Sequence, residues 1–250
     1  MSVLTAGVDL AAEPPRTAVA WLDWSPGRAH LTRLDLGADD ATCLEAMLTA
    51  DKTGIDCPLG WPAPFIDFIT AHRAGTVRVP PGVPGLTWRR ALTHRLTDHV
   101  VQARTGLRPL SPSADRIGHT TMRCAALLAA LAGQGHPVDR RGTGAVVEVY
   151  PAACLKLWSL PHQGYKRTRN LTSLGTLVDR LRESAPWLDL GTYEARCRVS
   201  DDALDAVICA LAARAAALGR TTTPSPEESP TAATEGWIAL PTIPLTDLAP

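Results

Sequence analysis

The chain lacks the charge imbalance and the lysine content of many polyanion-binding proteins. Lys+Arg and Asp+Glu both number 25 among 250 residues, so net charge does not indicate a polyanionic partner. Only three lysines are present, and nearly all the basic charge is arginine. Abundant Ala, Gly and Pro accompany the arginines, as GC-rich coding would produce. We therefore do not take arginine content as a sign of nucleic-acid binding.

Paired cysteines and long apolar runs are also missing. The six cysteines are scattered, and no two have the CxxC spacing of zinc or redox sites. We expect free thiols in a reducing cytoplasm and no disulfide-linked partner. The opening MSVLTAGVDL has no charged signal-peptide region, and the longest apolar run, CAALLAALAG, is too short to cross a bilayer. The sequence predicts a cytoplasmic protein without membrane association, of unknown oligomeric state.

What the sequence does have is alternating strand and helix patterns around a sizeable core, with a hydrophobic content of 45%. Apolar segments separated by turn residues predict three successive strands and, after a helix, a fourth. A fifth strand and two later helices follow, the last with Ser200 as N-cap and Gly219 as its stop. The predicted strands are 3–11, 17–24, 29–37, 52–56 and 145–150, and the predicted helices are 39–51, 120–135, 172–184 and 200–219.

Two aspartates stand where apolar strands end. Asp9 lies near the end of the first strand, and Asp56 leads from the fourth strand into Cys57-Pro58. Since carboxylates are rarely buried without a partner, their position needs a reason. For either residue alone, a turn is sufficient, because Asp readily bonds its own backbone before a Pro-Gly bend.

The last helix carries two more aspartates, Asp202 and Asp205, which lie on one helical face because they are three residues apart. Asp202 sits where an acidic residue stabilises any helix start. Asp205 lies within an apolar helix and is harder to explain structurally.

The element order matches the ribonuclease H-like fold, in which the first and fourth strands are neighbours. Asp9 and Asp56 would then face each other, with Asp202 and Asp205 close by. Four converging carboxylates repel unless a divalent cation lies between them, and Mg²⁺ or Mn²⁺ is the hard ion that oxygen ligands favour. Such a site suits phosphodiester cleavage with one or two metal ions.

The sequence also resembles a known bacterial family. The blocks GVDLA, IDCPLGWP, RLTD, EVYPAA, YK, DDALDAVICALAA and EGWI follow one another from Gly7 to Pro241. They are similar to the domain-of-unknown-function family numbered 429, which is expected to contain ribonuclease H-like nucleases. The resemblance implies that Asp9 and Asp56 are the strand ligands and that Asp202 and Asp205 are the paired helix ligands. Many superfamily members carry Glu on the fourth strand, so the shorter Asp56 is expected to reach the metal through water.

Four further residues are candidates for the site. Glu148 alternates with valines, which fits a solvent-facing position as well as a site role. Arg95 and Asp98 are three apart, so they either form a helical ion pair or line the cleft. Lys166 stands in the basic-aromatic stretch GYKRTRN, which is either a solvated loop or a phosphate-backbone contact.

The sequence thus predicts an α/β, ribonuclease H-like mixed sheet flanked by helices, with a mostly helical insertion between the fourth and fifth strands. The domain covers residues 1–219, with the insertion at about 61–140, a flexible linker over 220–234 and a C-terminal strap over 235–250. The predicted function is a metal-dependent nuclease or hydrolase whose partner is nucleic acid. Two alternatives remain: a non-catalytic module that binds nucleic acid or protein, and an actin-like phosphotransferase, disfavoured because Gly-rich phosphate turns are missing.

Overall fold

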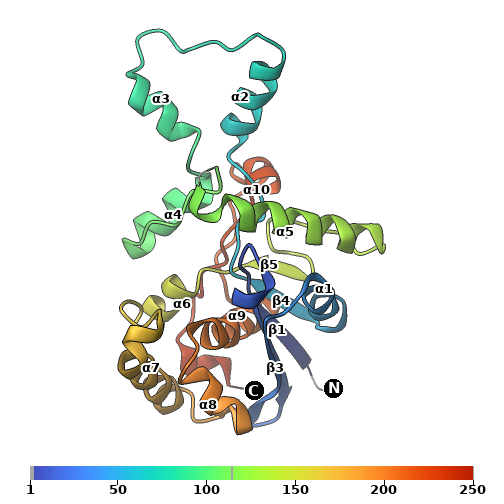
Figure 1. The fold of residues 1–250 in the computed structure, drawn as a ribbon, viewed down its shortest axis with the longest axis vertical. Coiled ribbons are helices and arrows are strands. Elements are labelled where there is room, and N and C mark those ends of the chain that lie inside the picture. The colour runs from blue at the N-terminus through green and yellow to red at the C-terminus, as the bar shows by residue number, and fades with distance from the viewer. Residues whose placement is uncertain (1–2, 114, 250) are drawn as a thin grey trace.

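The computed structural model describes residues 3–113 and 115–249, which form an α/β fold with a mixed sheet of six strands flanked by helices (Figure 1). The strands are β1 (Val3–Asp9), β2 (Ala18–Ser25), β3 (Arg28–Leu36), β4 (Lys52–Ile55), β5 (Val146–Glu148) and β6 (Leu188–Asp189). The α-helices are α1 (Asp40–Thr49), α2 (Ala63–Arg73), α3 (Gly85–Ala91), α4 (Leu96–Thr105), α5 (Asp115–Gly133), α6 (Pro151–Leu157), α7 (Leu171–Ser184), α8 (Glu194–Cys197), α9 (Asp201–Ala217) and α10 (Ser229–Glu235). The 3-10 helices are Pro14–Arg16, Thr168–Asn170, Gly191–Tyr193 and Leu245–Leu248.

The strand order across the sheet is β5-β4-β1-β2-β3-β6. The first three strands form an antiparallel meander, with a turn after Ser25 in which Gly27 has a positive φ of 78°. β4 then pairs with β1 in parallel, and β5 pairs with β4 in parallel. The adjacency of β1 and β4 is the relationship on which the predicted aspartate site depends.

Each face of the sheet has its own hydrophobic core. Along β2, Leu22 and Trp24 belong to the core that includes α6, α7 and α9, whereas Val19 and Trp21 belong to the core that includes α1 and α5. This alternation is the period-2 pattern of a strand covered on both faces. Figure 1 shows α9 on one side of the sheet and α1 on the other.

The predicted helices and strands are largely present. Helix α9 begins after Ser200, whose side chain accepts a hydrogen bond from Ala203 N, and Gly219 follows its end with a φ of 66°. The chain between β4 and β5 holds α2, α3, α4 and α5, and in Figure 1 the first two extend as an arm away from the sheet. Neither arm helix has a buried residue. Helix α6, which follows β5 after Val149 and Tyr150, was not predicted.

The C-terminal segment packs on the body of the protein. Ile238 forms a parallel bridge with Glu148 of β5, and Trp237 and Leu240 are buried. The stretch predicted to be a flexible linker contains helix α10, and Thr222 within it donates its backbone N–H to Leu240 O at 2.8 Å. The structure therefore places a helix at the end of this stretch and joins Thr222 to the strap, neither of which the sequence predicts.

None of the helices in the described ranges has both the length and the apolar character needed to span a membrane.

Candidate metal centre

Two glycines bring helix α9 close to the sheet. Gly7 of β1 pairs with Gly54 of β4, and both strands lie under α9. A Cβ atom at Gly7 would lie 2.0 Å from Ala206 O, and one at Gly54 would lie 2.4 Å from Cys209 O. Because no larger residue fits at either position, the helix backbone can pack directly on these strands.

The same register brings three aspartates together. Asp9 and Asp56 each stand two residues after one of these glycines, and Asp56 N donates to Val8 O at 2.9 Å. Asp205 projects from α9 toward the ends of both strands. The three carboxylates each offer an oxygen atom that lies within 4.8 Å of the other two. Asp9 and Asp56 are partly buried, and Asp205 is completely buried.

Asp205 is held by two neighbouring residues of the loop that follows α6. Tyr165 Oη donates a hydrogen bond to Asp205 Oδ1 at 2.8 Å. Lys166 Nζ lies 2.6 Å from the other carboxylate oxygen, Oδ2. Tyr165 is buried, whereas 49% of the Lys166 side chain is exposed. Lys166 therefore joins the cluster and supplies a positive charge beside three carboxylates.

The electrostatics of the cluster are those of crowded, desolvated acids. Burial, followed by the charges of Asp205 and Asp56, raises the pKa of Asp9 well above its usual range. Burial raises the pKa of Asp56 to about 7, against the opposing effect of Lys166. Burial also raises the pKa of Asp205, and Lys166 again opposes the shift. At neutral pH without a cation, the cluster retains protons that isolated aspartates would have lost.

Asp202, the fourth predicted ligand, lies elsewhere. Its carboxylate accepts two hydrogen bonds from Arg16, from Nε at 2.8 Å and from Nη2 at 2.7 Å. Asp202 is not among the three described acidic residues whose oxygens converge, although its charge contributes to the raised pKa of Asp9. The structure thus brings together three of the four predicted ligands and pairs the fourth with an arginine.

Three of the additional candidates form a second, buried cluster. Arg95 donates from Nη1 to Glu148 Oε2 at 2.8 Å and from Nη2 to Glu148 Oε1 at 2.7 Å. It also donates from Nη2 to Asp98 Oδ1 at 2.9 Å. Arg95 and Asp98 are each 1% exposed and Glu148 is 2% exposed. Glu148 is therefore not solvent-facing, and the guanidinium of Arg95 is already occupied by two carboxylates.

Glu148 of this cluster and Glu235 of α10 together hold the base of the arm. Glu235 of α10 accepts hydrogen bonds from Ala63 N at 2.8 Å and from Leu96 N at 2.6 Å, which are the first residue of α2 and the first residue of α4. Glu148 accepts another from Leu59 N at 3.0 Å. Two buried carboxylates thus hold the segments that lead into and out of the arm. No local pattern in the sequence indicates this role for Glu235, because its partners are more than 130 residues away.

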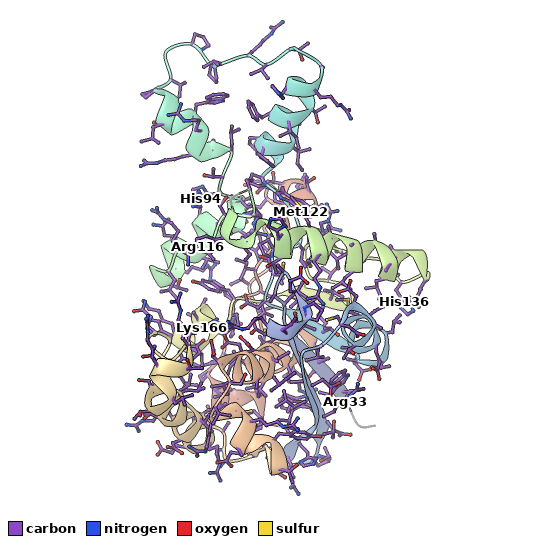
Figure 2. All side chains as sticks on the ribbon, in the orientation of Figure 1. Arg33, His94, Arg116, Met122, His136 and Lys166 are labelled. Carbon is purple, nitrogen blue, oxygen red and sulfur yellow. The ribbon has the colours of Figure 1, made fainter. Side chains whose placement is uncertain are left out.

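A cavity of about 560 Å³ lies beside the aspartate cluster. Its lining includes Asp56 and Lys166, together with Arg108, which follows α4, and Arg116 of α5. Figure 2 shows Arg116 and Lys166 on the same side of the molecule. The cavity gives a small ligand access to the cluster.

The fold and the site define an α/β protein with a carboxylate cluster at the ends of two parallel strands. The chain belongs to the family described as protein of unknown function (DUF429), whose model matches residues 7–229. The predicted family membership is thereby confirmed. No curated protein and no solved structure matches the chain significantly.

Sequence reasoning overlooked two parts of the site. In the sequence, Tyr165 is an aromatic residue within the basic stretch GYKRTRN, and no local pattern indicates that it donates a hydrogen bond to Asp205. The glycines were also overlooked, although a signal for them exists: Gly7-Val8-Asp9 and Gly54-Ile55-Asp56 repeat the pattern glycine, β-branched residue, aspartate. In the structure, both of these glycines lie directly under the backbone of α9.

Proposed function

We propose that the protein is a divalent-metal-dependent phosphodiester hydrolase of ribonuclease H-like fold, acting on nucleic acid. The observation that carries the proposal is the convergence of Asp9, Asp56 and Asp205, whose oxygens lie within 4.8 Å of one another. The order β5-β4-β1-β2-β3, with an antiparallel meander followed by two parallel strands, supports the fold assignment. On this assignment, the helices α2 to α5 are the insertion.

The donor set fits a hard cation. All three groups offer carboxylate oxygens, which suit Mg²⁺ or Mn²⁺ rather than a soft metal that prefers sulfur or imidazole ligands. Burial, together with the neighbouring carboxylates, raises the pKa values of Asp9 and Asp56, so their ionised forms need additional positive charge close by. A bound divalent ion would supply that charge, polarise a phosphoryl oxygen and lower the pKa of a coordinated water.

The protein's own residues have separable roles in this proposal. Asp9, Asp56 and Asp205 hold the cation, and the close packing of α9 on Gly7 and Gly54 sets their separation. Tyr165 fixes the orientation of the Asp205 carboxylate through its hydrogen bond. Lys166 balances part of the negative charge and lines the cavity through which a phosphodiester would approach. Asp202 is a positioning residue that anchors the start of α9 to Arg16.

The test is a cleavage screen with Mn²⁺ or Mg²⁺ over single-stranded, duplex and branched DNA and RNA. The proposal predicts cleavage of at least one substrate, abolished by EDTA and by Asp205→Asn. Metal and oligonucleotide binding without any cleavage would favour the alternative of a non-catalytic module. ATP consumption without cleavage would favour the phosphotransferase alternative.

A further inference from the structure

Four cationic side chains line the cavity beside the aspartate cluster, and two of them form ion pairs in the part of the chain that the structure describes. Of its cationic residues, Arg95 is bound by Glu148 and Asp98, and Lys166 is bound by Asp205. Arg108 and Arg116 also line the cavity, and neither has an ion-pair partner among the side chains that the structure describes. Both are exposed to solvent. Two guanidinium groups are therefore available to a ligand.

Their chemistry indicates the kind of ligand. A guanidinium group is planar and permanently charged, and it binds phosphate through two parallel N–H donors. Neither arginine forms an ion pair with the three aspartates described above, so both remain free to bind a second phosphate when a phosphodiester is held at the cluster. A substrate with a second phosphate beside the scissile one would reach them, and the arginines would offset the repulsion between that phosphate and the carboxylates.

We propose that Arg108 and Arg116 form a phosphate-binding subsite, so that the preferred substrate carries another phosphate group next to the bond that is cleaved. This inference rests on the proposed function and narrows its substrate class. The second phosphate is either an internal phosphodiester of a nucleic-acid strand or a terminal phosphate. A compound with one isolated phosphodiester is a poor substrate.

Three thymidine compounds distinguish these cases. TpT has one phosphodiester, pTpT adds a terminal 5′-phosphate, and TpTpT adds a second internal phosphodiester. Binding to the metal-free protein is measured in EDTA by calorimetry, and kcat/KM is measured with Mn²⁺. For the wild type we expect pTpT, TpTpT or both to bind about tenfold more tightly than TpT, equivalent to about 1.4 kcal/mol. The compound with the larger preference identifies the source of the second phosphate.

The variant Arg108→Gln/Arg116→Gln should reduce this preference to about one, both in binding and in kcat/KM. The control Arg104→Gln/Arg220→Gln removes the same charge from two exposed arginines that do not line the cavity, and should keep the wild-type preference. Single Arg108→Gln and Arg116→Gln variants, checked by circular dichroism, provide the same comparison if the double variant does not fold.

The possible outcomes separate this inference from the proposed function. A binding preference that depends on the two arginines supports the subsite even if no compound is cleaved, in which case only the hydrolase proposal fails. Cleavage of all three compounds with equal efficiency by the wild type overturns the subsite and leaves the hydrolase proposal standing. The subsite is also overturned if the wild type binds all three compounds equally or binds none of them. It is overturned as well if the control Arg104→Gln/Arg220→Gln loses the preference over TpT to the same extent as the cavity variant.

Discussion

Gly7 and Gly54 are paired across β1 and β4, and helix α9 lies against both of them. This contact places Asp205 within reach of Asp9 and Asp56, because each of those aspartates follows its glycine by two residues. The site is therefore built on backbone packing between regular elements, and its geometry depends on the absence of two side chains.

The first prediction concerns this packing. Gly7→Ala adds a Cβ atom 2.0 Å from Ala206 O, so α9 must shift or the strand must distort. We expect a loss of stability of about 3 kcal/mol, at the upper end of typical overpacking costs. Denaturant unfolding measures the change. The control is Gly133→Ala at the end of α5, where a Cβ atom meets nothing within 4 Å, and which should not be destabilised. Equal stability of the Gly7→Ala variant and the wild type would contradict the close contact.

The second prediction concerns pH. The pKa of Asp56 is raised to about 7 in the folded protein, so the folded state binds a proton that the unfolded state loses near its usual pKa of 3.8. The stabilisation from this proton is complete below that lower value and is lost as the pH rises toward 7. We expect metal-free stability to fall by up to about 1 kcal/mol per pH unit between pH 4 and 7. Stability curves of the wild type and Asp56→Asn in EDTA measure this, and the variant should have the flatter curve. Parallel curves would show that Asp56 titrates normally.

The third prediction concerns the buried arginine. Arg95→Met leaves Glu148 and Asp98 buried without their cation. Uncompensated buried charge is costly, and we expect a loss of about 3–5 kcal/mol in unfolding free energy. The matched control is Arg104→Met, an exposed position on α4, the helix that Arg95 precedes as the N-cap residue. The contrary result is that Arg95→Met and the control have the same unfolding free energy while only Arg95→Met weakens oligonucleotide binding. That result would mean that Arg95 contacts the substrate and is not needed to neutralise the buried carboxylates.

The fourth prediction concerns Lys166. Its ammonium lies 2.6 Å from Asp205 Oδ2 and competes with a metal ion for the same carboxylate. Lys166→Met should reduce metal-free stability by about 1 kcal/mol, since half of the side chain is exposed and screened by solvent. The same variant should bind Mn²⁺ more tightly than the wild type in a calorimetric titration. Lys156→Met, at the exposed lysine of α6, is the control and should change neither quantity. Weaker Mn²⁺ binding in Lys166→Met would contradict this competition and show that the lysine helps Asp205 to bind the metal.

Much of the fold could be predicted because local sequence patterns determine most of its strands and helices. The apolar run of β2 and the N-cap of α9 are visible in the sequence, and the mixed sheet flanked by helices is confirmed. The sequence predicts both Asp202 and Asp205 as ligands, because they lie on one helical face. Only the fold places Arg16 beside Asp202 and Lys166 beside Asp205.

The contacts that could not be predicted join distant segments. Glu148 reads as a half-exposed strand residue, but α4 and the C-terminal strap cover it, and Arg95 neutralises it. Glu235 follows a polar stretch with linker composition, yet its carboxylate accepts hydrogen bonds from Ala63 N at the start of the arm and from Leu96 N after it. In both cases the burial of a charge depends on a partner that periodicity does not reveal.

The most direct test of the account is calorimetric titration of Mn²⁺ into the wild type and Asp9→Asn. The pKa of Asp9 is raised by burial and by its acidic neighbours, so an amide should replace it with little loss of metal-free stability. The account predicts saturable binding to the wild type and at least about tenfold weaker binding to the variant, while metal at about 100 times Kd raises wild-type stability by about 2.7 kcal/mol. Asp35→Asn, in β3, should bind Mn²⁺ like the wild type. Equal Mn²⁺ affinity in the wild type and Asp9→Asn would contradict the metal centre.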